Sequence, residues 1–181
     1  ELKTATASID SHVWRPIHAW APEVRPQALW PYLVEARSLT ERLRAKAGGA
    51  FHVRVLEEGA VALPAEDAAL LHIKAGEQGF MRQVYLCGSE PMVYARSLAA
   101  GEGARWLEEL GDNPLGQKVF AEKDVRRSPI EATHLSPGQP LYEAAVVRLD
   151  RKPAELWARR SLLTVKGAAI LIYECFLPGL A

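Results

Sequence analysis

This sequence of 181 residues has few cysteines, no net charge and no long apolar run. Its two cysteines, Cys87 and Cys175, lie in apolar runs without C-x-x-C spacing, so they indicate reduced core thiols rather than a zinc site or a disulfide framework. The 22 basic and 22 acidic residues cancel, which leaves no overall field to attract nucleic acid or anionic membranes. No apolar run approaches the roughly 20 residues that span a bilayer. We therefore expect a cytoplasmic protein with no nucleic-acid partner and no stable membrane insertion.

An apolar content of 49% in a chain of this length is enough for one domain with a sizeable core. We expect a single domain over residues 1–181, present as a monomer, with no internal repeats. Residues 1–25 are rich in Trp, Pro and His without a clean period, and we interpret them as an arm across the surface. The sequence begins at Glu1 rather than Met, so we expect its natural start to have been altered or removed.

The apolar pattern predicts helices and antiparallel strands. A capping box of Ser38 and Glu41 begins a helix that Gly48 ends. A tight turn at Lys166-Gly167 indicates a hairpin, and hairpins build antiparallel sheet, so we predict an α+β fold with helices on one face or end of the sheet. The predicted helices cover residues 26–36, 38–47 and 104–121, the last broken at "GDNPLG", and the predicted strands cover 51–58, 80–87, 92–98, 130–135, 141–149, 161–165 and 169–177.

Three charged residues fall on otherwise apolar faces of predicted strands: Glu174, Arg82 and Arg96. A buried carboxylate or guanidinium needs a partner or a bound ion, because burial alone costs several kcal/mol. One interpretation is a structural ion pair among the three. The other is a closed pocket in which an arginine binds a ligand carboxylate and the glutamate meets a hydroxyl or a proton.

The stretch "GDNPLGQKVF" has the signature of a helix start. Asn113 suits the N-cap and Pro114 the first helical position, which leaves the amides of Leu115 and Gly116 without intrahelical partners. Such amides favour anions, although an ordinary capped surface helix has the same pattern.

Taken together, several segments resemble the chorismate pyruvate-lyase family from about residue 29 to the C-terminus. They are "SLTERL", "MRQVYLCGSEPMVYARS", "LEELGDNPLGQKVF", "LWARRS" and "ECFLP". The resemblance implies an antiparallel sheet with helical flaps that close over an internal ligand pocket. It also implies that chorismate is converted to 4-hydroxybenzoate and pyruvate, at the head of ubiquinone synthesis.

The resemblance further implies a set of site residues. Arg82 falls on the arginine that binds the ligand carboxylate, Leu115 on the position whose amide meets the ligand, and Glu174 on the acid that contacts the ring hydroxyl. Leu39 falls on a flap position that packs on the ligand. The chain departs from the family around residues 132–155, where "LYEAAVVRLD" looks like an added strand of sheet or flap.

The chemistry needs neither metal nor redox cofactor, because forming an aromatic ring drives the loss of pyruvate, and the sequence has no His or Cys cluster at metal-ligand spacing. Glu174 either exchanges a hydrogen bond with the C4 hydroxyl or removes the C4 proton as a general base. Alternatively the hydrogen passes within the substrate while the protein supplies conformation and electrostatics. A second hypothesis is a non-catalytic domain that senses a small aromatic acid, although no basic helix-turn-helix segment accompanies it.

The remaining charged residues receive no catalytic role at this point. Arg96 is open as a partner of Glu174, a second ligand arginine or, as we prefer, part of a structural ion pair. The Arg pairs at 126–127 and 159–160 have the pattern of solvated or sheet-edge residues. His52 and His72 are expected at the surface or its boundary.

Overall fold

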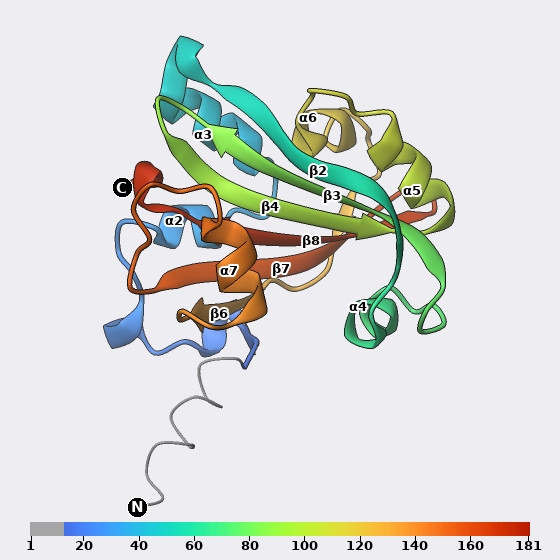
Figure 1. Ribbon diagram of the computed structural model, residues 1–181, viewed down its shortest axis with the longest axis horizontal. Coiled ribbons are helices and arrows are strands. Elements are labelled where there is room, and N and C mark those ends of the chain that lie inside the picture. The colour runs from blue at the N-terminus through green and yellow to red at the C-terminus, as the bar shows by residue number, and fades with distance from the viewer. Residues whose placement is uncertain (1–12) are drawn as a thin grey trace, which may run out of the picture.

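The computed structural model describes residues 13–181, in which eight strands form one antiparallel sheet with the order β1-β6-β7-β8-β4-β3-β2, and β5 also pairs with β7 (Figure 1). The predicted α+β class is confirmed. The strands are β1 (Arg15–Pro16), β2 (His52–Ala62), β3 (Gln78–Cys87), β4 (Pro91–Ala99), β5 (Arg126–Arg127), β6 (Glu131–Leu135), β7 (Leu156–Val165) and β8 (Ala168–Phe176).

Helices cover both faces of this sheet, not one face or end as predicted. The α-helices are α2 (Trp30–Leu33), α3 (Leu39–Ala47), α4 (Ala65–Leu70), α5 (Gly101–Glu108), α6 (Leu115–Val119) and α7 (Pro140–Val146), and the 3-10 helices are η1 (Ile17–Ala19), η2 (Pro22–Val24), η3 (Gly48–Ala50) and η4 (Pro178–Leu180). Helices α2, α3, α5 and α6 pack on one face, which we call the site face, whereas α4 and α7 pack on the other.

The predicted helix cap and hairpin turn, which depend only on neighbouring residues, are confirmed. Ser38 caps α3 by accepting a hydrogen bond from the Glu41 amide at 3.2 Å, and Gly48 ends the helix with a φ of 58°. Lys166 and Gly167 join β7 to β8 with φ values of 50° and 77°, as a tight hairpin turn requires. The turn sets the register of the β7–β8 hairpin at the centre of the sheet.

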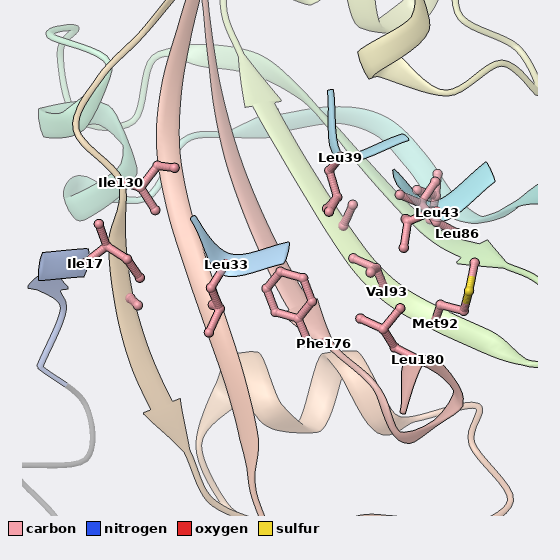
Figure 2. Close-up of a cluster of buried hydrophobic side chains, with 13 residues drawn as sticks. Ile17, Leu33, Leu39, Leu43, Leu86, Met92, Val93, Ile130, Phe176 and Leu180 are labelled. Carbon is pink, nitrogen blue, oxygen red and sulfur yellow. The ribbon is translucent and has the colours of Figure 1, made fainter. Parts of the chain in front are cut away.

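The core of the site face lies between the sheet and helices α2 and α3. Figure 2 shows Leu33 from α2, with Leu39 and Leu43 from α3, over the strands that carry Val93 and Phe176. All five side chains are buried, and each contributes about 1.5–3 kcal/mol by leaving water. Apolar contact therefore holds these two helices over the sheet.

The predicted strand over residues 141–149 is wrong: the segment forms α7, which crosses the opposite face of the sheet (Figure 1). Pro140 occupies the first turn, and Tyr142, Ala145 and Val146 share one buried helical face. They pack on Tyr85 and its neighbours. Burial of this face outweighs the strand preference of the β-branched pair at 146–147.

The segment that precedes the sheet is only partly an arm. Residues 1–12 of the predicted arm lie outside the described part of the chain. Within residues 13–25, Arg15–Pro16 pair with β6, Ile17 is buried, and Trp20 contacts Trp157 edge-on. The helix predicted over residues 26–36 shortens to the four residues of α2. In residues 13–181, no helix has both the length and the apolar character needed to cross a membrane.

Candidate functional site

A cavity of about 50 Å³ lies on the site face, beneath α3 and α6. All four residues that the sequence singled out line it: Arg82 from β3, Glu174 from β8, Leu39 from α3 and Leu115 from α6. Small-molecule sites usually hold roughly 300–1,000 Å³. The cavity therefore has the predicted lining, but a ring-sized ligand requires the covering helices to move apart.

Arg82 lines this cavity and is 2% exposed. Its Nη1 donates to the carbonyl oxygen of Gly111 at 2.6 Å and to Glu58 Oε2 at 3.2 Å, while its Nη2 donates to the carbonyl oxygen of Asn113 at 2.9 Å. The Glu58 side chain is 35% exposed, so it balances the Arg82 charge only in part. Arg82 thus ties the loop before α6 to the sheet and still faces the cavity.

Glu174, near the middle of β8, is 7% exposed and forms an ion pair with Arg159, whose Nε lies 2.8 Å from Glu174 Oε1. The two residues are direct cross-strand partners on β7 and β8. Neither Arg82 nor Arg96 pairs with Glu174. The expectation of a buried partner was right, but the partner is Arg159.

Arg159 is fully buried, which corrects the expectation of a solvated or edge position. Strand β7 has neighbours on both sides, so it is not an edge strand. The Arg159 side chain lies on the site face, under α2. Besides Glu174, Arg159 Nη1 donates to the carbonyl oxygens of Tyr32, Leu33 and Glu35 at 2.7–3.2 Å. Its Nη2 has no hydrogen-bond partner among the described residues. Arg159 therefore joins the site carboxylate to the chain segment that leads into α3.

Arg127, also expected to be solvated, instead lines the same cavity as Arg82. Its Nε donates to the carbonyl oxygen of Ala36 at 2.8 Å and its Nη2 to that of Arg37 at 3.2 Å, while Nη1 donates to Ser161 Oγ. Burial lowers the pKa of Arg127 to about 10, although the nearby charge of Glu174 acts in the other direction. Arg127 therefore remains a cation at neutral pH.

The start of α6 differs in detail from the prediction. Pro114, not Asn113, is the N-cap, and the helix begins at Leu115. The Asn113 side chain donates instead to the carbonyl oxygen of Leu110 at 3.0 Å. The first amides of α6 still have no intrahelical partner, and the Leu115 amide begins the helix at the cavity wall.

Arg96 and Arg160 belong to the opposite face of the sheet, because both lie in the cross-strand row of Tyr173. Arg96 Nε donates to Tyr94 Oη at 3.2 Å and forms no ion pair with another described residue, so none of its three proposed roles is supported. Arg160 pairs with Glu131 and Glu66. His52 and His72 are exposed, as expected. Within residues 13–181, no three His, Cys, Asp or Glu side chains gather as a metal site would require.

Sequence reasoning missed Arg159 and Arg127, and for Arg159 a signal was present. A two-residue turn at 166–167 places Val165 opposite Ala168, and counting back along both strands places Arg159 opposite Glu174. Arg127 gave no such signal. It belongs to a two-residue strand whose position follows only from its pairing with β7.

Comparisons with known proteins agree on one family. The model of the chorismate lyase family matches residues 13–180. A protein of Azoarcus sp. that carries the name probable chorismate pyruvate-lyase is 34% identical over 183 residues, which cover 96% of this chain and 94% of that protein. A protein of the same name from Pseudomonas aeruginosa is 37% identical over 154 residues, with 82% of this chain and 83% of that protein covered.

Solved structures with a similar fold belong to ligand-binding domains of transcriptional regulators. The ligand-binding domain of a GntR-family regulator from Bordetella bronchiseptica has a TM-score of 0.55 at 20% identity, over 72% of this chain and 86% of that one. The effector domain of PhnF from Mycobacterium smegmatis has a TM-score of 0.61 at 10% identity, over 80% and 91% of the two chains. At these identities the likeness concerns the fold alone.

Proposed function

This chain belongs to the chorismate lyase family, and from that membership we propose that it converts chorismate into 4-hydroxybenzoate and pyruvate. The observation that carries the proposal is that Arg82, Leu115, Glu174 and Leu39 line one cavity on the site face. In this proposal the enzyme is a carbon–oxygen lyase of the cytoplasm, it opens ubiquinone synthesis, and it acts on a small molecule with no nucleic-acid partner.

The reaction requires no added reactant. The C4 hydrogen and the C3–O ether bond of chorismate are lost, the ring becomes aromatic, and the enolpyruvyl methylene gains a hydrogen to become the methyl group of pyruvate. The atoms of the two products together equal those of the substrate. The protein therefore has to bind an anion, orient it and keep water away from the reacting ring.

Each of the four residues has a role suited to its surroundings. Arg82 binds the ring carboxylate, because a guanidinium is a planar donor of several hydrogen bonds. The Leu115 amide, at the open start of α6, donates to the same ligand. Leu39, the buried first residue of α3, packs on the ring.

Glu174 accepts a hydrogen bond from the C4 hydroxyl. Its Oε1 already accepts from Arg159, whereas no described residue donates to its Oε2, so one oxygen is left for the ligand. Because the carboxylate belongs to an ion pair, it is better suited to accept a hydrogen bond or a proton than to donate one. A general base at C4 and a passive acceptor beside an internal hydrogen transfer both fit this arrangement.

The test is turnover by the purified protein. We expect chorismate to yield 4-hydroxybenzoate by chromatography and an equal amount of pyruvate by a coupled dehydrogenase assay. Arg82→Met should lower kcat/KM by roughly 100-fold or more, because a buried charge-assisted pair is lost. Arg105→Met, at an arginine whose side chain is 72% exposed on α5, is the matched control and should keep full activity.

Circular dichroism of each variant shows whether it still folds. This matters for Arg82→Met, since the carbonyl oxygens of Gly111 and Asn113 lose their donor. Binding of 4-hydroxybenzoate by the unaltered protein without any turnover of chorismate would refute the proposed activity. That result would favour a sensing domain for an aromatic acid.

A further inference from the structure

The cavity wall carries two cations whose charge the protein does not cancel within the cavity. Arg159 neutralises Glu174, which leaves Arg82 and Arg127 as cations on the cavity wall with no acid on that wall to balance them. Glu58 reaches Arg82 from a partly exposed position, and Glu35, the other acid near Arg127, is paired with Arg42 at 2.7 Å. The cavity therefore suits a ligand with two negative charges better than a ligand with one.

These two cations come from strands on opposite sides of β8, the strand that carries Glu174. Arg82 is on β3 and Arg127 on β5, and the strands run in the order β3-β4-β8-β7-β5, so β8 with Glu174 is the middle strand. Arg127 is the direct partner of Leu163, which also lines the cavity, so it faces the same side of the sheet. Four strand spacings separate the two backbones by ~19 Å, and the two long side chains both reach into the cavity that lies between these strands.

Both guanidinium groups keep donors for a ligand. Each has five N–H donors, and three of these meet acceptors among the described residues. Two donors remain on Arg82 and two on Arg127. Two donors are what a bidentate bond to a carboxylate uses.

We propose that Arg127 binds the second carboxylate of the substrate, the one on the enolpyruvyl group, while Arg82 binds the ring carboxylate. This inference rests on the proposed function, because it assigns the two ends of chorismate within the same cavity. The ring carboxylate and the C4 hydroxyl lie across the ring from each other, and the enolpyruvyl ether is on C3, beside C4. With Arg82 at the ring carboxylate and Glu174 at the hydroxyl, the enolpyruvyl group lies on the Arg127 side of Glu174.

This assignment makes Arg127 the group that distinguishes substrate from product. Breaking the C3–O bond sends the second carboxylate away with pyruvate, so 4-hydroxybenzoate engages Arg82 but not Arg127. Loss of Arg127 should therefore weaken binding of the dianion and spare binding of the monoanion. A residue that only supports the fold would affect both ligands alike.

The variants are chosen to keep the cavity wall intact. Arg127 also borders a groove on the outer side, lined by Ile17, Val34 and Pro129 among others, so truncation to alanine would open the wall. Arg127→Met keeps the aliphatic stem, and Arg127→Lys keeps the charge. The matched control is Arg126→Met, at the neighbouring exposed arginine of the same strand.

The probes are 4-hydroxybenzoate and 3-(carboxymethoxy)-4-hydroxybenzoate, an unreactive analogue with a second carboxylate on an ether oxygen at ring position 3. By calorimetry, we expect Arg127→Met to lower the affinity for the dianionic analogue by roughly 30-fold or more. Its affinity for 4-hydroxybenzoate should be unchanged within error. Arg82→Met should lower the affinity for both ligands, and Arg126→Met should change the affinity for neither. Chorismate kcat/KM should fall by about 100-fold in Arg127→Met and recover in part in Arg127→Lys.

Equal weakening of both probes in Arg127→Met would overturn the inference, and so would undiminished affinity for the dianionic analogue. If the unaltered protein turns over chorismate and Arg127→Met does so equally well, the inference fails while the proposed function stands. If the unaltered protein binds both probes but produces no 4-hydroxybenzoate, the proposed function fails. The selective loss of the dianion would in that case still assign Arg127 to the second carboxylate.

Discussion

At the residue scale, the pairing of Arg159 with Glu174 explains how an acid can lie in the middle of the most apolar strand. An unpaired buried charge costs several kcal/mol, and this cost is offset only when the partner and the remaining polar atoms are satisfied. Arg159 supplies the partner at 2.8 Å and in turn binds three backbone carbonyls. The pair fixes the Glu174 carboxylate at the cavity wall and at the same time supports the fold.

The two residues should therefore be strongly coupled in stability. Glu174→Leu alone should lower the free energy of unfolding by about 3–5 kcal/mol, because it leaves Arg159 buried without a counter-charge. Arg159→Met should cost at least as much, since three carbonyls also lose a donor. The double variant should be more stable than the sum of the single effects by about 1–3 kcal/mol.

Urea denaturation of the four proteins in the cycle measures this coupling. Additive effects would show that the buried pair contributes no interaction free energy. The double variant should turn over chorismate more slowly whatever its stability, because the C4 hydroxyl has no acceptor at position 174.

At the element scale, α3 and α6 meet over the cavity and must separate to admit a ligand. Gly116 on α6 faces Thr40 on α3 so closely that a Cβ at this position would lie 2.7 Å from Thr40 Oγ1. On the outer side, Arg44 Nη2 donates to Gln117 Oε1 at 2.8 Å, which links the same two helices. The absence of a side chain at position 116 allows the two helices to close.

Gly116→Ala should hold the two helices apart and so weaken product retention. We expect its dissociation rate for 4-hydroxybenzoate to rise by roughly 10-fold, since about 1.4 kcal/mol of closing contact corresponds to that factor. Stopped-flow fluorescence measures the rate.

Gly49→Ala is the matched control, because a Cβ there meets nothing within 4 Å and the backbone is not left-handed. It should release the product at the original rate. Identical rates in Gly116→Ala and the unaltered protein would show that closure does not depend on this contact.

At the scale of the whole molecule, the surface gives little reason for self-association. The exposed large apolar residues within residues 13–181 are Val13, Val24 and Val147, which are scattered along the chain. The edge strand β2 carries Glu57 and Glu58 and an irregularity in register between Val55 and Glu57. Charges and bulges of this kind discourage pairing between sheet edges.

We therefore predict a monomer. Light scattering coupled to size-exclusion chromatography should give a mass near 19.9 kDa that does not change with protein concentration. A stable dimer mass at low micromolar concentration would contradict this prediction. The next step would then be to identify the surface that associates.

The sequence by itself determined those features that depend on short-range chemistry. The Ser38 cap, the turn at 166–167, the alternation that turns Arg82 and Glu174 toward the site face, and the family resemblance were all readable from local patterns. Antiparallel sheet followed, because hairpins need only neighbouring residues to form.

Only the tertiary structure decided which distant groups meet. Residues 141–149 became a helix because their apolar face could be buried on the sheet, and Arg127 reached the cavity because a two-residue strand paired with β7. Neither outcome is encoded within a few residues of the position concerned. The charge balance of the cavity, and with it the second carboxylate site, depends on contacts among β3, β5, β7 and β8, which only the folded sheet brings together.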